Sequence, residues 1–531
     1  MQSPPPSIFN DVLGPVMRGP SSSHSAAANR IGRLARDLVA GPIKKVIVRY
    51  DPNGSLVTTH KDQGTDLGLY SGLLGWTPED SRIPGYEAAL EEAGIEIDLR
   101  YESYDAPHPN FYRLELFDGN GREFRLDAIS TGGGMIELRA IDGVEILSEG
   151  DFHHTLAWLE EEPEASFFDE FDAVAEGVGW HPSVNGGGIF NVFSRQALDG
   201  SFIEKLERQP GCRQVRQLQV VLPVLSRRGL KVGFQRAGEM LEQAELVDQP
   251  LGICGLRYES ERSGLGEEEL RAMMDDLITV FEAAVKTGLA GTDYADRVLP
   301  SQSPGFQRAE EAGTLVPANI NNQIIRYVSA IMEVKSSLGV IVAAPTAGSC
   351  GAMPGAVLAV GHAMGKDRKE IGEALFAAGL IGVFIARDAT FAAEEGGCMA
   401  ETGSGASMAA AAIVQLAGGN QAQQLAAASM ALQNAFGLVC DPVANRVEAP
   451  CLGKNIMAAT NALSCANMAL AGYDPLIPMD EVVKSMNEVA HQMPRELRCT
   501  NLGGLAITPT SKKIAERLKS GAGCGSRKCA C

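Results

Sequence analysis

The sequence predicts a multidomain protein in which an α+β N-terminal domain precedes a mostly all-α domain. Strand-like runs in which apolar and polar residues alternate lie between residues 44 and 130, as in a sheet with one face in solvent. From residue 255 to about residue 471, alanine- and leucine-rich segments with helical periodicity alternate with glycine breaks. A chain of 531 residues also has room for two or three hydrophobic cores.

Composition excludes several classes of partner. The formal net charge is −20, so no basic surplus exists to neutralise the phosphates of nucleic acid or an anionic membrane surface. Apolar runs such as MAAAAIVQLA are shorter than the ~20 residues that cross a bilayer, so we expect no membrane span. The start MQSPPPSIFNDV lacks the pattern of a secretion signal, so the 11 cysteines indicate a reducing cytoplasm and not a disulfide scaffold.

A serine-rich stretch near the N-terminus predicts a loop that leads into a helix. The residues GPSSSH precede a periodic apolar segment from Ala26 to Leu38. Serine is a preferred N-cap residue, and the free N–H groups of a first helical turn form an anion site. The residues alone favour capping as the role of Ser21 to Ser25.

The rest of the first domain, residues 1–150, reads as mixed helix and strand. The turn signal DPNG predicts a hairpin between strands at residues 44–50 and 55–60. The segment 61–76 leads into a helix, and a second helix over 84–94 ends at Gly94. Three further strands are expected at residues 95–104, 111–118 and 122–130.

Residues 151–250 are less transparent and predict a connecting or inserted α+β module. A helix is expected near Ser201 to Gln209 and a strand over the apolar residues 217–225. A regulatory, amino-acid-sensing role for this module is one hypothesis that its residues leave open.

The third expected domain, residues 251–515, is a helical bundle with small side chains that permit close packing. One long amphipathic helix, opened by acidic residues, is predicted within residues 255–289, and another within residues 318–339. Residues 516–531, rich in glycine, lysine and cysteine, are expected to form a flexible tail.

A glycine-containing loop within this bundle suits ligand binding. In PTAGSCGAMPGAV, the small residues 347–351 allow the backbone to approach a ligand, and the helix expected next presents N–H groups suited to a carboxylate. The alternative is a tight turn between two helices.

Three cysteines in this domain form a candidate metal centre. Cys440 follows Cys398 by 42 residues and Cys451 follows Cys440 by 11, among small and helix-forming residues. Thiolates are the ligands of iron-sulfur clusters, and three ligands leave one iron open. Buried cysteine also behaves as a small apolar residue, so core packing is the alternative.

The motifs around these residues resemble a known family. The segments EEGGCMAETGSGASMAAAA, GLVCDPVANRVEAPC and APTAGSCGAMPG resemble the catalytic domain of the iron-sulfur-dependent L-serine dehydratases, also called L-serine ammonia-lyases. GPSSSH, HPNFYRLELF and STGGGMIEL resemble the family's smaller α+β domain, so the chain looks like the single-chain form with fused beta and alpha domains. The resemblance implies that residues 251–515 are the catalytic iron-sulfur domain.

The resemblance implies a set of site residues. A 4Fe-4S cluster would be carried by Cys398, Cys440 and Cys451. His24 is the candidate for proton transfer, since the unperturbed pKa of histidine lies near neutrality. The residues expected to bind substrate are Ser22, Ser23, His108, Thr346, Gly348 and Ser349.

Two of these assignments have open alternatives. His108 precedes a proline and is expected in an extended or turn segment, where a packing role is equally open. The C-terminal tail departs from the family pattern because it runs on past the Gly-Gly-Leu-Ala motif. Its last residue, Cys531, is a candidate fourth ligand that would act as a displaceable plug on the cluster.

The implied reaction is the dehydration and deamination of L-serine to pyruvate and ammonia, a step of amino-acid degradation. The open iron would act as a Lewis acid on the β-hydroxyl. The resemblance also implies a homodimer. Open alternatives are L-cysteine desulfidation or a related lyase reaction, a pyridoxal-phosphate-dependent dehydratase, and a non-catalytic amino-acid-sensing protein. No phosphate-binding glycine loop paired with a lysine supports the pyridoxal-phosphate alternative.

Overall fold

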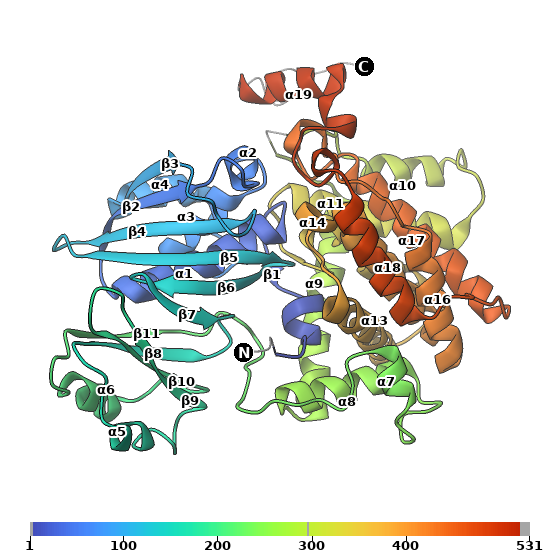
Figure 1. The fold of residues 1–531 in the computed structure, drawn as a ribbon. Coiled ribbons are helices and arrows are strands. Elements are labelled where there is room, and N and C mark those ends of the chain that lie inside the picture. Colours follow the sequence, from blue (N-terminus) through green and yellow to red (C-terminus); the bar gives the residue numbers. More distant parts are fainter. Residues whose placement is uncertain (1–3, 295–296, 521–531) are drawn as a thin grey trace.

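The computed structural model describes residues 4–294 and 297–520. Strands gather in the part of the chain before residue 220, and the residues after 250 are almost entirely helical (Figure 1). The predicted fold class, an α+β N-terminal part followed by a mostly helical part, is therefore confirmed. The prediction that Cys531 caps a cluster lies outside the described residues.

A six-stranded sheet with the strand order β3-β2-β4-β5-β6-β7 forms the first half. β2 pairs with β3 in parallel and with β4 antiparallel, and the remaining pairs are antiparallel. The helices α1 and α3 share a hydrophobic core with this sheet. The elements of this half are β2 (Ile43–Tyr50), β3 (Glu96–Tyr101), β4 (Phe111–Asp118), β5 (Glu123–Gly132), β6 (Met135–Ile141), β7 (Val144–Ser148), α1 (Ala27–Val39), α2 (Leu56–Thr59), α3 (Thr65–Leu73) and α4 (Tyr86–Ala93).

The predicted hairpin at residues 44–60 is wrong in its second strand. Residues 56–59 form the short helix α2, because both edges of β2 are already occupied by β3 and β4. Thr59 Oγ1 donates to the Ser55 carbonyl at 2.8 Å, which is a bond within a helical turn. The helices predicted at 61–76 and 84–94 are confirmed as α3 and α4, and Gly94 ends α4 with a φ of 66°.

A four-stranded antiparallel sheet with the order β11-β8-β10-β9 follows and has a small core of its own. The helix predicted near residues 201–209 is confirmed, but the strand predicted at 217–225 stops at Leu218. Val224 instead exchanges two hydrogen bonds with the side chain of Asn10, which removes that segment from the sheet. The elements are β8 (His153–Leu159), β9 (Gly177–Pro182), β10 (Gly188–Ser194), β11 (Gln214–Leu218), α5 (Ala165–Asp169) and α6 (Gly200–Glu207).

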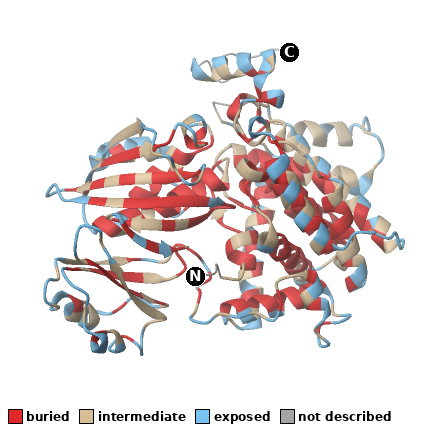
Figure 2. Cartoon of the chain, viewed as in Figure 1, coloured by how far each residue is buried: buried red, intermediate tan, exposed pale blue. Residues whose placement is uncertain are grey.

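The helical half packs around α13 and α15, whose small side chains are almost all buried (Figure 2). The long helix predicted after a turn within 255–289, and opened by acidic residues, is confirmed as α9. A separate helix, α8, precedes it and ends at Gly264, which adopts a φ of 76°. The helices are α7 (Ala237–Leu241), α8 (Leu251–Ser263), α9 (Glu267–Ala290), α10 (Ser303–Glu311), α11 (Asn319–Ser336), α12 (Ala352–Ala363), α13 (Arg368–Asp388), α14 (Ala393–Cys398), α15 (Ser404–Leu416), α16 (Gln421–Gln433), α17 (Cys451–Leu470), α18 (Met479–Gln492) and α19 (Pro509–Lys519).

The N-terminal segment joins the two halves. The helical turn η1 (Ile8–Val12) packs against α13, and the strand β1 (Val16–Met17) pairs antiparallel with β12 (Ile341–Val342). The buried Glu259 of α8 accepts hydrogen bonds from the Ser7 hydroxyl and the Ile8 amide. These contacts fix the next turn, η2 (Ser22–Ala26), between the sheet and the bundle.

Among the described helices, none taken singly has the length and apolar character to cross a membrane. One pair, Arg368–Asp388 with Ala393–Leu416, would qualify by length and composition, with a bend of 86° between its members.

The crossing of α1 and α3 supplies a test of the fold. A Cβ added at Gly72 would lie 2.2 Å from the Asn29 carbonyl oxygen, which is closer than any real contact. We expect Gly72→Ala to lower the free energy of unfolding by about 1–3 kcal/mol, because the two backbones must move apart. Thermal and denaturant unfolding measure the change.

The matched control is Gly453→Ala on α17. A Cβ there meets no atom within 4 Å, so alanine should keep or raise stability by reducing the freedom of the unfolded chain. Equal stabilities for the two variants would contradict the close crossing.

Candidate active site

Three segments distant in sequence meet where the sheet half contacts the helical half. They are the turn η2, the loop between β12 and α12, and the start of the α14 region. The Ser22 hydroxyl accepts a hydrogen bond from the Ala347 amide at 3.2 Å. His24 Nδ1 lies 3.4 Å from Glu394 Oε1. The structure thus brings the serine-rich turn and the glycine-containing loop into one site.

His24 is fully buried and bonded on both ring nitrogens. Its Nδ1 lies 3.0 Å from the Ser21 hydroxyl and its Nε2 lies 2.9 Å from the Thr59 hydroxyl. Burial, with a smaller contribution from the charge of His60, lowers the pKa of His24 to about 3. The imidazole is therefore neutral at pH 7, and the expectation of a pKa near neutrality does not hold here. Its role in proton transfer stays a prediction.

Glu394 is a candidate that the sequence did not single out. Its side chain is 4% exposed, and burial, reinforced by the charges of Glu401 and Glu395, raises its pKa to about 7. Among the described residues, its Oε2 is buried and has no hydrogen-bond partner. In the sequence it is one of two adjacent glutamates, and only the fold shows which of them reaches His24.

The serines of η2 do not cap α1 as the residues alone suggested. Ser21 precedes the turn without a capping bond and contacts His24 instead. The Ser25 hydroxyl donates to the Gln63 carbonyl, and Ser23 is buried in the same turn. The hydroxyls of Ser21 and Ser25 therefore form hydrogen bonds within the site and to a neighbouring segment.

The loop before α12 is ordered by its own polar side chains. Thr346 and Ser349 form a capping box around the short turn η4 (Ala347–Ser349), which links a strand to a helix and not two helices. Thr346 Oγ1 donates to Glu401 Oε1 at 2.7 Å, and a Cβ at Gly348 would lie 2.7 Å from that same oxygen. Only glycine therefore allows the loop to approach Glu401 this closely.

His108 lies at the edge of this site in a turn, as its position before a proline predicted. Its Nε2 is 3.5 Å from Glu395 Oε1, and its Nδ1 accepts a hydrogen bond from the Asn110 amide. Its charge lowers the pKa of Glu394 and so partly offsets the effect of burial on that carboxyl. A substrate-binding role for His108 stays a prediction.

The three predicted cysteines are all buried, and a fourth cysteine lies with two of them. Cys398 ends α14, Cys440 lies in the loop after α16, and Cys451 begins α17. Cys398, Cys440 and Cys451 are 3%, 5% and 6% exposed, and Cys499 is 4% exposed. Hydrogen bonds to the Cys398 and Cys499 thiols, together with burial, hold the pKa of Cys440 well above its ordinary value. The Cys398 sulfur, the Cys440 sulfur and a Glu401 oxygen lie within 4.8 Å of one another.

A lysine next to these thiols provides positive charge. Lys454 Nζ lies 3.8 Å from Cys398 Sγ and 2.7 Å from Asp441 Oδ1. Burial alone would lower the pKa of Lys454, but the negative charges of Cys398 and Asp441 outweigh it and raise that pKa. Burial, with the nearby Cys398, raises the pKa of Cys451 as well. An ammonium in this position suits a centre that accumulates thiolate charge.

Known proteins are similar to this chain over much of its length. The profile described as serine dehydratase alpha chain matches residues 201–506. The chain belongs to that family. It is 37% identical over 289 residues to the "Probable L-serine dehydratase, alpha chain" of Bacillus subtilis (strain 168), which covers 54% of this chain and 96% of the relative. It is 25% identical over 500 residues to "L-serine dehydratase 2" of Escherichia coli (strain K12), covering 92% of this chain and 96% of the relative.

The family recognised from the cysteine motifs is thereby confirmed, including the single-chain form. The match to the Escherichia coli protein spans both the sheet half and the helical half of this chain. Membership of a dehydratase family makes the protein a lyase.

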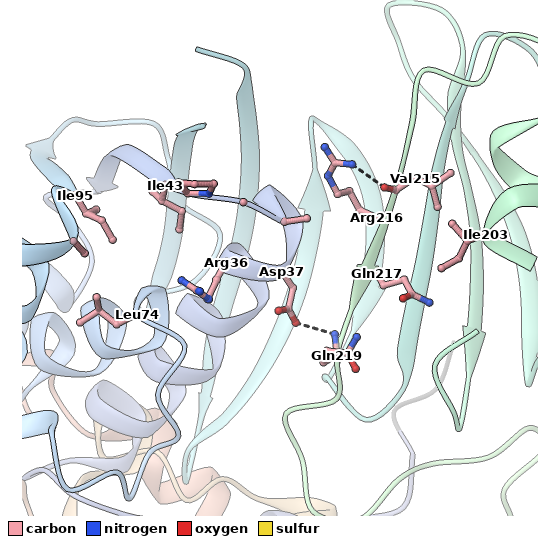
Figure 3. Close-up of a pocket in the computed structure, with 14 residues that line it drawn as sticks. Arg36, Asp37, Ile43, Leu74, Ile95, Ile203, Val215, Arg216, Gln217 and Gln219 are labelled. Atoms are coloured by element: carbon pink, nitrogen blue, oxygen red, sulfur yellow. Dashed lines mark hydrogen bonds between the residues drawn. The ribbon is translucent and has the colours of Figure 1, made fainter. Parts of the chain in front are cut away.

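A cavity of about 850 Å³ lies apart from this site, between α1, α3 and the sheet module around β11 (Figure 3). None of the predicted site residues lines it. Its two arginines, Arg36 and Arg216, donate to backbone carbonyl oxygens, and Asp37 accepts from the Gln219 amide. Because these charged groups are already bonded within the protein, the cavity is not included in the candidate site.

The pKa of Glu394 gives a test by protein stability. Since folding raises that pKa from 4.5 to about 7, the stabilisation is complete below pH 4.5 and is lost as the pH rises through 7. We expect Glu394→Gln, in protein freed of metal by a chelator, to gain stability relative to the unsubstituted chain between pH 4.5 and 8. Over this pH range, the difference in free energy of unfolding between Glu394→Gln and the unsubstituted chain should change by at most about 3 kcal/mol.

Denaturant unfolding at a series of pH values measures this difference. Glu395→Gln, which changes the neighbouring and more exposed carboxylate, is the matched control. A pH-independent difference for Glu394→Gln would show that this carboxyl does not titrate in that range.

Proposed function

We propose that this protein is an L-serine ammonia-lyase that converts L-serine to pyruvate and ammonia with a 4Fe-4S cluster held by Cys398, Cys440 and Cys451. The observation that carries the proposal is the meeting of these buried cysteines with Glu401, Thr346 and the His24–Glu394 pair. The L-serine dehydratase names of the relatives support the choice of substrate.

The donor set fits an iron-sulfur cluster. Buried thiols in mutual contact are soft ligands, and magnesium or calcium sites would instead need a set of oxygen ligands. Glu401 is the one carboxylate within 4.8 Å of Cys398 and Cys440 among the described residues. When bound, the cluster would supply a Lewis-acidic iron that makes the β-hydroxyl of serine a better leaving group.

The residues of the chain would bind and orient the amino acid. The η4 loop lies at the start of α12, but the Gly351 and Ala352 amides there already donate to Asn455 Oδ1, so the side chains of the loop would bind the carboxylate. Ser22 and Thr346 hold this loop against η2 and Glu401, so the carboxylate site and the proton-transfer pair keep a fixed relation. Ser23, Gly348, Ser349 and His108 belong to the same proposal as substrate-binding residues.

The His24–Glu394 pair would move the Cα proton. Its removal leaves the electron pair of the Cα–H bond to form the Cα–Cβ double bond, as the Cβ–O bond breaks and water departs. Glu394, with a pKa of about 7, is matched to a proton exchange near neutrality, and its Oε1 faces His24 Nδ1. The resulting enamine becomes an imine and hydrolyses in water to pyruvate and ammonia.

The organisation of the whole chain belongs to the same proposal. We assign residues 1–150 to the beta-chain-like domain, 151–250 to a connecting module and 251–515 to the catalytic domain, with 516–531 as a tail. We further propose a homodimer in the cytoplasm without nucleic-acid or membrane partners. Size measurement of the purified protein by light scattering would contradict the dimer if it returned the mass of one chain.

The first experiment is iron and acid-labile sulfide analysis of anaerobically purified protein, with pyruvate formation from L-serine assayed on the same sample. We expect about four iron and four sulfide per chain, as a 4Fe-4S cluster requires. Serine replacement of Cys398, Cys440 or Cys451 should abolish both the iron and the activity. Cys465→Ser, at a fully buried cysteine on α17, is the matched control and should retain both.

Three results would contradict the proposal. Protein without iron but with pyridoxal phosphate would indicate the other class of dehydratase. A cluster with turnover of L-cysteine but not of L-serine would indicate desulfidation. A cluster without turnover of either amino acid would indicate a sensing protein.

The proton-transfer role has its own test. We expect His24→Ala to lower kcat by about 10²–10⁴-fold while the iron content stays unchanged, since general acid–base residues contribute that much. Glu394→Gln should lower kcat in the same direction and remove the pH dependence that its carboxyl causes. Wild-type kcat in His24→Ala would exclude the pair as the base.

A further inference from the structure

The cavity of about 850 Å³ outside the candidate active site lies where two parts of the sheet half meet. One wall comes from the ends of α1, α3 and α4 and the start of β2. The other wall comes from the four-stranded sheet, through its strand β11 and the helix α6 (Figure 3). A cavity of this volume has the size of a binding site for a small molecule. The proposed reaction makes no use of it.

Aliphatic side chains line both walls of this cavity. Leu74 and Ile95 belong to the first wall, and Ile203 and Val215 belong to the second. All four are only half-buried, so part of their apolar surface stays in contact with the cavity. Because the transfer of apolar surface out of water is favourable, these two walls suit a ligand with a hydrocarbon body.

Two arginines provide positive charge at the same walls. The Arg36 guanidinium donates to the Leu73 carbonyl. The Arg216 guanidinium donates to two backbone carbonyls, those of Leu38 and Val215. A guanidinium has more N–H donors than these bonds use, so both groups keep donors for a ligand. Among the described residues, no carboxylate forms an ion pair with either arginine.

The charges on the cavity walls favour an anion. Asp37 is the one carboxylate among the lining residues, so two guanidinium groups leave a surplus of one positive charge. Burial, followed by the charge of Arg122, lowers the pKa of Arg216. An anion beside Arg216 would favour its charged form. A ligand with one negative charge would balance the surplus, whereas a zwitterion would leave it unbalanced.

We propose that this cavity binds an aliphatic monocarboxylate. The guanidinium groups of Arg36 and Arg216 hold the carboxylate, and the hydrocarbon chain lies along the aliphatic side chains of the two walls. The ligand therefore contacts α1 and the four-stranded sheet at once and binds without a covalent step. This site is separate from the proposed active site, and the inference does not depend on the proposed reaction.

The test is calorimetric titration of the full-length, anaerobically purified protein with sodium octanoate. We expect one octanoate to bind per chain. In the series from butyrate through hexanoate to octanoate, binding should tighten about fourfold for each methylene, because each one is transferred from water to the aliphatic walls.

Two matched ligands test the charge of the head group. 1-Octanol has the chain of octanoate without its charge, and we expect it to bind at least about tenfold more weakly, since it lacks charge-assisted hydrogen bonds. L-Leucine has the carbon skeleton of 4-methylpentanoate with an added ammonium group. We expect L-leucine to bind more weakly than 4-methylpentanoate, because the zwitterion has no net charge.

Variants of the lining residues test the location. Arg36→Gln and Arg216→Gln should each weaken octanoate binding by about tenfold. Ala93→Trp, at an exposed lining position on α4, should fill part of the cavity and also weaken binding. Arg208→Gln is the matched control, because Arg208 is an exposed arginine next to α6 that does not line the cavity.

Thermal unfolding checks that each variant is folded. If Arg216→Gln folds poorly, Arg36→Gln and Ala93→Trp still decide the result, since both change exposed positions. Loss of affinity in these two variants and not in Arg208→Gln would support the inference.

Four results would overturn it. They are the absence of saturable octanoate binding, an equal affinity for octanoate in Ala93→Trp and the unsubstituted chain, an equal affinity for 1-octanol and octanoate, and tighter binding of L-leucine than of 4-methylpentanoate. The last result would indicate a site for a zwitterion, with Asp37 facing its ammonium group.

Discussion

Burial of ionisable groups between two halves of one chain is the constraint on which the site depends. His24, Glu394, Glu401 and the four cysteines are shielded from water, and His24 and Glu401 contact polar groups of other segments. Those partners come from both halves, as in the contacts from Ser22 to the Ala347 amide and from Gln63 to Cys499. The chemistry of the site is therefore inseparable from the docking of the sheet half on the helical half.

The helices and strands that depend on interactions between residues close in sequence were predicted from local sequence patterns. The strands β2–β5, the helices α3 and α4 and the alanine-rich bundle follow from periodicity and turn residues, and all are present. The second strand of the hairpin failed because β3, which is distant in sequence from β2, takes the edge that the turn signal assigned to its neighbour. The acidic start of α9 was readable in the sequence, but the separate helix α8 before Gly264 was not predicted.

Some residues of the candidate site were likewise predicted from the sequence, and others were found only in the structure. The motifs around Cys398, Cys440 and Cys451 are readable as short segments, and so are the serine-rich turn and the loop at Thr346. Glu394 carries no local signal, because its contact with His24 joins residues that are hundreds of positions apart. The low pKa of His24 likewise arises from burial, which the sequence of the turn does not reveal.

The packing of η1 against α13 has a consequence for how the protein is made. A Cβ at Gly379 or Gly382 of α13 would collide with Ile8 or Val12, so these glycines form the groove that receives the turn. Residues 8–12 leave the ribosome long before residues 368–388 exist to cover them. Their apolar side chains must therefore stay exposed, or be shielded by a chaperone, until most of the chain has been synthesised. If translation stalled before α13 was made, the sheet half would be present while the apolar residues 8–12 stayed exposed.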